Sequence, residues 1–303
     1  MNISDFLVRG IIKSINARFS FADTVSTVTK GIFVHDTDPV SSFIFAKALT
    51  VGALVSPLLE GDEKYSLRWE YDGKISSVLV DVNAKCEVRG IPRETKLASM
   101  VSKEDELFGN DGKVTAIKSV DGKILNSGCC KAALMDIAED MAFFFSTSDQ
   151  LETGISVIID LNGDPQKPVK KACGFMLQAM PGCDLKAFDV CRNRMNSPEF
   201  TAVIKSSEMT EEKKLWSIIG ALLGISVEDS PENKIKKEIF YEFSSSPDYV
   251  CSCSRKKMKQ AVSVLKKEEI DDIFREEKEI RIKCEFCNKT YSFAENDFSI
   301  DGL

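Results

Sequence analysis

Four cysteines near the end of the chain are the residues whose types and spacing most clearly indicate chemistry. Cys251 and Cys253 form a C-S-C triplet, and Cys284 and Cys287 form a C-E-F-C tetrad thirty residues further on. Four thiolates in a chain with one histidine are typical of a tetrahedral zinc site, with each sulfur about 2.3 Å from the metal. Such a shell leaves no position for a water molecule, so we expect a structural or regulatory site and not a hydrolytic one.

The same four thiols can also be oxidised, and zinc does not bind the oxidised form. A sulfenic acid formed on one thiol would have a resolving thiol beside it. Nearby cations favour the reactive thiolate over the thiol; they are Arg255, Lys256, Lys257, Lys283 and Lys289. The cluster therefore predicts a metal site and a redox switch as two states of one small, metal-dependent tail.

Other interpretations of the cluster remain open. A static zinc ribbon would use the metal only to fold the tail, although ribbon pairs are commonly about 15–20 residues apart. A thiol–disulfide oxidoreductase would need a thioredoxin-like fold around Cys284 and Cys287. A nucleic-acid-binding ribbon is disfavoured, because residues 251–303 carry eleven lysines and arginines against eleven aspartates and glutamates and so lack a phosphate-binding face.

The composition is that of a globular protein that does not bind polyanions. The chain has 303 residues, of which 43% are hydrophobic, and a net charge of −7. This charge argues against nucleic acid or an anionic membrane as the main partner. The N-terminal segment lacks the features of a signal peptide, and the longest uncharged apolar run, residues 48–59, is too short to span a bilayer. We expect a cytoplasmic protein whose other cysteines are reduced bystanders; they are Cys86, Cys129, Cys130, Cys173, Cys183 and Cys191.

An α+β core domain is predicted for residues 1–181, mainly an antiparallel sheet with packed helices. Hydrophobic alternation and Asp-Gly turns predict a strand meander over residues 64–120. Residues 1–36 are expected to form strands or an irregular start. Further helices are expected at residues 40–55 and 132–145, and further strands at residues 155–161 and 173–180.

A helical middle region and linker is predicted for residues 182–250. Helices are predicted for residues 184–195 and for a segment capped by Thr210. Residues 229–249 have the prolines and serines of a linker but also several large apolar residues, so we expect them to lie against the body in one state.

A small zinc-binding domain is predicted for residues 251–303. Within it, we predict a helix at residues 254–277. We also predict a hairpin around the second cysteine pair, with strands at residues 278–283 and 290–293.

No motif for catalysis or nucleotide use accompanies the cluster. The single histidine, His35, argues against Ser-His-Asp or Cys-His catalysis, and we expect it at the surface or capping a helix. A Walker motif and a G-x-G-x-x-G fingerprint are both missing from the sequence, which therefore does not support the use of ATP. We do not expect an enzyme.

In these residues the chain resembles the 33-kDa redox-regulated heat-shock chaperones, often called 33-kDa chaperonins. The most specific similarity is the tail, where Arg255 follows the first cysteine pair and Asn288, Tyr291 and Phe293 follow the second. The body adds similar segments at residues 80–83, 88–90, 137–145 and 174–178.

The resemblance implies an inactive, zinc-bound reduced form. Oxidation, aided by heat, would form the disulfides Cys251–Cys253 and Cys284–Cys287, release zinc, and disorder the tail and the linker. The exposed apolar surface would then hold unfolding client proteins without ATP, often as a homodimer. Candidate client-binding residues are Leu215, Ile219, Leu222, Ile239, Phe240 and Phe243.

Overall fold

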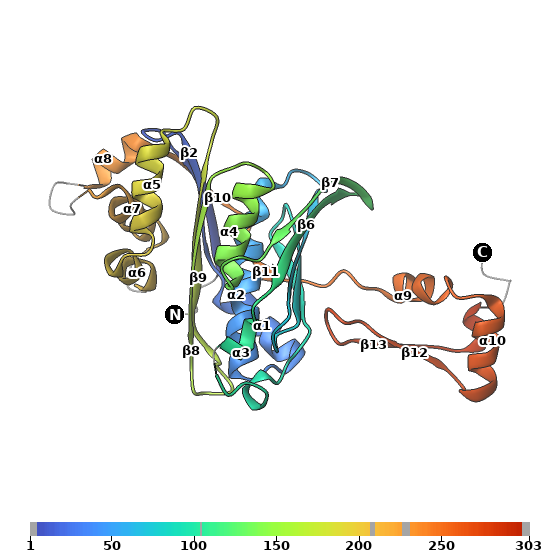
Figure 1. Ribbon diagram of the computed structural model, residues 1–303. Helices are drawn as coiled ribbons and strands as arrows, with labels where there is room; N and C mark the ends of the chain where they lie inside the picture. The colour runs from blue at the N-terminus through green and yellow to red at the C-terminus, as the bar shows by residue number, and fades with distance from the viewer. Residues whose placement is uncertain (1–4, 104, 207–209, 226–230, 299–303) are drawn as a thin grey trace. The chain divides into compact units, whose positions relative to one another are not determined.

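The computed structural model describes residues 5–103, 105–206, 210–225 and 231–298. The chain divides into two compact units, Met1–Tyr249 and Val250–Leu303. The first unit contains two β-sheets with helices packed between and outside them, and the second is a small α+β unit (Figure 1). The predicted α+β class is confirmed.

A five-stranded sheet runs through the first unit. Its strand order is β10-β1-β2-β9-β8, and each neighbouring pair is antiparallel. The bounds are β1 Phe6–Ile12, β2 Ala17–Asp23, β8 Thr153–Leu161, β9 Val169–Ala179 and β10 Ile239–Ser244. The outermost strand β10 therefore comes from a part of the sequence far from the strand that it pairs with.

A six-stranded sheet contains the predicted meander. Its order is β11-β5-β4-β3-β6-β7, in which the short β11 is parallel to β5 and the other pairs are antiparallel. The bounds are β3 Lys64–Tyr71, β4 Ser77–Asn83, β5 Glu87–Pro92, β6 Gly112–Val120, β7 Lys123–Lys131 and β11 Asp248–Tyr249.

Three helices lie between the two sheets and share one apolar core with both (Figure 1). They are α1 Val25–His35, α2 Pro39–Val55 and α4 Ile137–Thr147, and the short elements η1 Ser56–Leu58, η2 Leu97–Ser99 and α3 Asp105–Phe108 lie in the connections. Helix α2 begins with Asp38, whose carboxylate accepts from the Ser41 amide, and Pro39 follows it as the first helical residue, a favoured start for a helix. Over the described residues, Pro39–Leu58 is the one helical stretch long and apolar enough to cross a membrane; 78% of its most apolar window is buried, as expected of a core helix.

Four helices cover the other face of the five-stranded sheet. They are α5 Leu185–Arg194, α6 Pro198–Lys205, α7 Glu211–Leu223 and α8 Pro231–Glu238. Thr210 caps α7 by accepting from the Lys213 amide, and Gly224 ends it at φ +70°, a left-handed position that favours glycine. The apolar face of α7 lies in a second core with strands β1, β2 and β9.

The second unit consists of two helices and a hairpin. The bounds are α9 Arg255–Val262, α10 Lys267–Glu276, β12 Ile280–Lys283, β13 Thr290–Phe293 and η4 Glu295–Phe298. Strands β12 and β13 pair antiparallel, so the predicted hairpin is confirmed.

Several sequence predictions of local structure were wrong. Residues 1–36 contain two of the expected strands, β1 and β2, but also the unexpected helix α1. The sequence of α1, VSTVTKGIFVH, is rich in β-branched residues that locally favour a strand. Helix α4 starts at Ile137 and not at residue 132, because Ala132 still pairs with Gly112 and Asp136 provides the cap. The helix α6 was not anticipated.

Two further corrections concern the end of the chain. The linker-like segment contains α8, β10 and β11, while residues 229 and 230 lie outside the described residues. The single helix expected at residues 254–277 is two helices, since α9 ends at Val262 and a new start forms where the Glu269 carboxylate accepts from the Lys266 amide.

Candidate metal centre

The two cysteine pairs meet in the second unit. Cys251 and Cys253 lie in the extended segment before α9, whose cap Ser254 accepts from the Lys257 amide. Cys284 and Cys287 lie in the turn between β12 and β13. All four Sγ atoms lie within 4.8 Å of one another.

The second pair is held by the backbone of its turn. The Cys284 amide donates to the Lys289 carbonyl at 2.9 Å, and the Asn288 amide donates to the Cys284 carbonyl at 2.8 Å. Asn288 has a left-handed φ of 58°, a conformation that asparagine tolerates better than most residues. The hairpin therefore presents the two sulfurs on a folded turn.

The spacing of the sulfurs fits a metal ion. The Sγ atoms of Cys251 and Cys284 are 3.7 Å apart, and those of Cys253 and Cys287 are 3.3 Å apart. In a tetrahedral zinc site with bonds of about 2.3 Å, neighbouring sulfurs would be about 3.8 Å apart. Among the described residues this is the one group of three or more possible ligands close enough to share a metal ion, and its donors are the soft sulfurs that zinc favours.

The thiols differ in acidity. Burial acts to raise the pKa of Cys253, but hydrogen bonding to Tyr291 and to the other three thiols outweighs it and lowers the pKa to about 7. The Tyr291 hydroxyl lies 3.1 Å from the Cys253 sulfur. Burial raises the pKa of Cys284 and raises that of Cys287 to about 12. Cys253 therefore forms a thiolate more readily than Cys284 or Cys287.

A small apolar core supports the cluster. Phe293 is fully buried, and the Arg255 guanidinium lies 4.4 Å above its ring. Arg255 also donates to the Ser292 carbonyl and pairs with Asp297 at 2.7 Å. The buried members of this core are Val262, Ile270, Ile280, Cys284, Tyr291 and Phe293. This is little apolar surface for an independent fold.

Of the other six cysteines, three lie in the core and three do not. Cys86, Cys173 and Cys191 are buried, Cys130 and Cys183 are partly buried, and Cys129 is exposed. Burial raises the pKa of Cys86 and Cys173 to about 12, which makes both thiols unreactive.

The six candidate client-binding residues separate into two groups. Four are buried in the second core of the first unit, namely Leu215, Ile219 and Leu222 on α7 and Ile239 on β10. The other two, Phe240 and Phe243 on β10, are 65% and 41% exposed. The structure therefore shows the first four in a covered state.

His35 is buried, which corrects the expectation of a surface or capping residue. It is the last residue of α1, and its Nε2 lies 3.0 Å from the Tyr249 hydroxyl. That hydroxyl donates to the Gly90 carbonyl at 3.1 Å. Tyr249, the last residue of the first unit, is thus anchored in the core two residues before Cys251. The two partners are separated by 214 positions, so no local pattern pointed to this contact.

A buried charge cluster was also missed. Asp23 on β2 accepts from Lys171 on β9 at 2.5 Å, and Lys214 on α7 lies 3.6 Å from the same carboxylate oxygen. Burial acts to lower the pKa of Lys171, but the neighbouring Asp23 carboxylate outweighs burial, so the pKa of Lys171 is raised. Burial and the neighbouring Lys171 lower the pKa of Lys214 to about 8. The other oxygen of Asp23 has no hydrogen-bond partner among the described residues.

A sequence signal for this charge cluster existed. Lys171 alternates in phase with Cys173 and Phe175, and Lys214 lies one turn before Ile218 on the apolar face of α7. Charged residues in phase with a core face are expected to be buried and paired.

Comparison with known proteins identifies similar chains. The model of the Hsp33 protein family matches residues 5–294. The 33 kDa chaperonin of Geobacillus sp. (strain WCH70) is 27% identical over 97% of this chain and 96% of its own length. The 33 kDa chaperonin of Bacillus cereus (strain G9842) is 26% identical over 98% of both chains. The crystal structure of the 33 kDa chaperonin from Thermotoga maritima superimposes with a TM-score of 0.78 at 23% identity, over 96% of this chain and 95% of that chain, so the fold is shared.

Proposed function

The chain belongs to the Hsp33 family of chaperones, and we propose that it is a redox-regulated holdase that works without ATP. Its reduced form is inactive and carries zinc on Cys251, Cys253, Cys284 and Cys287. The observation that supports this most directly is the meeting of four sulfurs within 4.8 Å of one another. When bound, zinc keeps the four sulfurs as thiolates and, at about 10–16 kcal/mol for small zinc domains, supplies most of the folding free energy of the second unit.

Oxidation removes the donors that the metal needs. A thiolate of one pair attacks a peroxide oxygen, the O–O bond breaks, hydroxide leaves, and the thiolate sulfur becomes a sulfenic acid. The second sulfur of the pair attacks the sulfenic sulfur, water leaves, and a disulfide forms. In forming each disulfide, Cys251–Cys253 or Cys284–Cys287, the two thiols thus pass two electrons to one peroxide. The small apolar core of the second unit is then too small to keep it folded.

Loss of order spreads along the chain from the second unit to the linker. Functionally, residues 1–181 act as the core domain, residues 182–250 as the middle region that responds, and residues 251–303 as the switch. Once the middle region loosens, its covered apolar residues join the exposed ones in binding unfolding clients; they are Leu215, Ile219, Leu222, Ile239, Phe240 and Phe243. The oxidised protein acts in the cytoplasm, without nucleic acid or membrane, and associates as a homodimer.

The position of the C-x-x-C pair does not favour the alternative of an oxidoreductase. In thioredoxin-like enzymes that pair accompanies a βαβ pattern, whereas Cys284 and Cys287 lie in the turn of a two-stranded hairpin. A four-sulfur shell also leaves no open coordination position for a substrate. The observed position of the pair and the closed shell of the proposed zinc site both support a role without catalysis.

Zinc release measured beside client protection tests this function. The reduced protein should contain one zinc per chain, and peroxide at raised temperature should release it while suppressing light scattering from a denaturing client. The variant Cys284→Ser should bind zinc more weakly by about 100-fold, because one of four sulfurs carries about a quarter of the binding free energy. Cys129→Ser, which changes an exposed cysteine outside the cluster, is the matched control. Client protection that is the same before and after oxidation would refute the proposed switch.

A further inference from the structure

The edge of strand β1 is occupied by a segment of the linker. Strand β10 pairs antiparallel with β1, from Leu7 opposite Ser244 to Ile12 opposite Ile239. The other four strands of this sheet all come from residues 6–179. β10 is therefore the one strand of the sheet that belongs to the region expected to lose order on activation.

The direction of the backbone groups in β10 follows from one hydrogen bond. The Lys13 amide donates to the Glu238 carbonyl at 2.7 Å, one position beyond the paired strands. Because antiparallel pairing alternates with a period of two, the amides of Phe240, Glu242 and Ser244 face β1. The amides of Ile239, Tyr241 and Phe243 point to the open side of the sheet.

One face of β10 packs on the outer helices. Ile239 is buried in the second core, and the Tyr241 ring meets Trp216 of α7 edge to face, with centroids 5.0 Å apart. Phe243 lies 6.3 Å from the ring of Phe6 on β1. Every second side chain of the segment is thus apolar and in contact with the body.

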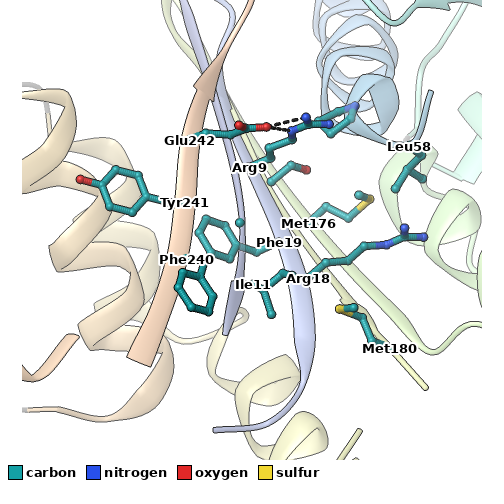
Figure 2. A pocket seen from close by; sticks show the side chains of 13 residues that line it. Arg9, Ile11, Arg18, Phe19, Leu58, Met176, Met180, Phe240, Tyr241 and Glu242 are labelled. Atoms are coloured by element: carbon teal, nitrogen blue, oxygen red, sulfur yellow. Dashed lines mark hydrogen bonds and ion pairs between the residues drawn. The ribbon is translucent and has the colours of Figure 1, made fainter. Parts of the chain in front are cut away.

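The opposite face borders a cavity of about 390 Å³. Figure 2 shows the Phe240 ring next to Ile11 at this cavity, and Glu242 paired with Arg9 above it. The rest of the lining combines the apolar Ile11, Pro57, Leu58, Met176 and Met180 with the polar Arg18 and Ser20. Methionine side chains adapt to ligands of different shape, and the volume is in the range of sites that accept side chains or small ligands.

We propose that the edge of β1 is a client-binding site and that β10 occupies this site in the reduced protein, where a client segment would otherwise pair. This inference rests on the proposed function, because the edge opens when the linker loses order. An extended segment of an unfolding protein then pairs with β1 in place of β10. Its backbone supplies affinity that does not depend on sequence, as in other cases of strand addition. Its alternating apolar side chains take the positions of Tyr241 and Phe243 on one face and of Phe240 beside the cavity on the other.

The charged residues on and beside β1 give this site a preference for certain client sequences. Arg9 lies directly opposite Glu242 and forms an ion pair with it, and the Lys13 ammonium lies 4.6 Å above the Phe240 ring. An incoming segment with an aromatic residue opposite Ile11 and an acidic residue opposite Arg9 reproduces both contacts. The site therefore selects extended, apolar segments that carry a carboxylate, and it discriminates against lysine-rich ones.

A labelled peptide with the sequence of residues 238–245, EIFYEFSS, tests this inference on the full-length protein. Fluorescence anisotropy should show saturable binding to the oxidised protein, and binding at least about 10-fold weaker to the reduced zinc form, in which β10 fills the site. Methylation of the three peptide amides that face β1, at the positions of Phe240, Glu242 and Ser244, should abolish binding. Methylation at the positions of Ile239, Tyr241 and Phe243 is the matched control and should leave binding within about 3-fold of the parent peptide, because these amides point away.

The outcomes separate this inference from the function on which it rests. Equal binding of the two methylated peptides would overturn strand addition, because it would show that side chains alone attach the peptide. Client protection that persists at saturating parent peptide would overturn this inference alone. An oxidised protein that protects no client would overturn the proposed function and this inference with it.

Discussion

Replacing Lys214 by methionine should stabilise the first unit. Lys214 is buried on α7, and burial together with the neighbouring Lys171 lowers its pKa from the ordinary value of 10.5 to about 8. At about 1.36 kcal/mol per pH unit, this difference corresponds to about 3 kcal/mol of stability lost at neutral pH. Methionine has a similar length and no charge to bury, and Asp23 keeps its hydrogen bond with Lys171. We therefore expect Lys214→Met to raise the free energy of unfolding by about 3 kcal/mol at pH 7.

The gain should depend on pH in a defined direction. Below about pH 8 the Lys214 amine is charged in both states, so the folded wild-type protein bears the whole cost of burying it. Between about pH 8 and 10.5 the folded state binds fewer protons than the unfolded state, so wild-type stability contributed by this group rises with pH. The variant lacks this group, and its advantage over the wild type should shrink to nearly zero as pH approaches 10.5.

Urea unfolding followed by tryptophan fluorescence measures this effect. Both tryptophans of the chain, Trp69 and Trp216, are buried in the first unit, so the signal does not report unfolding of the second. Lys213→Met, at the exposed neighbouring position on the same helix, is the control and should change stability by less than about 0.5 kcal/mol. A Lys214→Met protein no more stable than the wild type, or one whose advantage is the same at pH 7 and pH 10, would refute the reasoning.

Two further substitutions test the contacts on either side of the unit boundary. Tyr249→Phe keeps the ring but removes the hydroxyl that contacts His35 and Gly90. It should therefore lower the free energy of unfolding of the first unit by about 1–3 kcal/mol, measured by urea unfolding. An unchanged urea midpoint would show that the hydroxyl does not anchor the linker. Phe293→Ala empties the core of the second unit and should cost about 3–5 kcal/mol of folding. Because folding and metal binding are linked, its zinc affinity, measured by competition with a chromophoric chelator, should fall at least about 100-fold. The exposed control Lys278→Ala should retain the zinc affinity of the wild type. Equal zinc affinities of Phe293→Ala and the wild type would show that the apolar core does not support the metal site.

The candidate metal site was predictable because its chemistry is local. Each cysteine pair lies within a few residues of the sequence, so a single turn brings two sulfurs together whatever the rest of the chain does. The tail offers four thiols and no histidine, which leaves few ways to complete a ligand set. The meander was predictable for the same reason, since alternation and Asp-Gly turns act over a few residues.

Local preference also explains where prediction failed. The β-branched residues of α1 favour a strand, but packing between the two sheets stabilises a helix there. Residues 239–244 lie in the segment predicted as a linker, and their aromatic and β-branched residues favour a strand. Nothing in that segment specifies a partner some 230 positions away on β1.

The sequence alone determined the kind of ligand, the two sulfur pairs and the hairpin that carries the second pair. Only the tertiary structure decided that His35 meets Tyr249, that Lys214 and Lys171 share the carboxylate of Asp23, and that β10 closes the edge of β1. The physical reason is that periodicity records which face of an element is buried, but not which distant element covers it. The choice among distant partners is made by packing and by the pairing of buried polar groups.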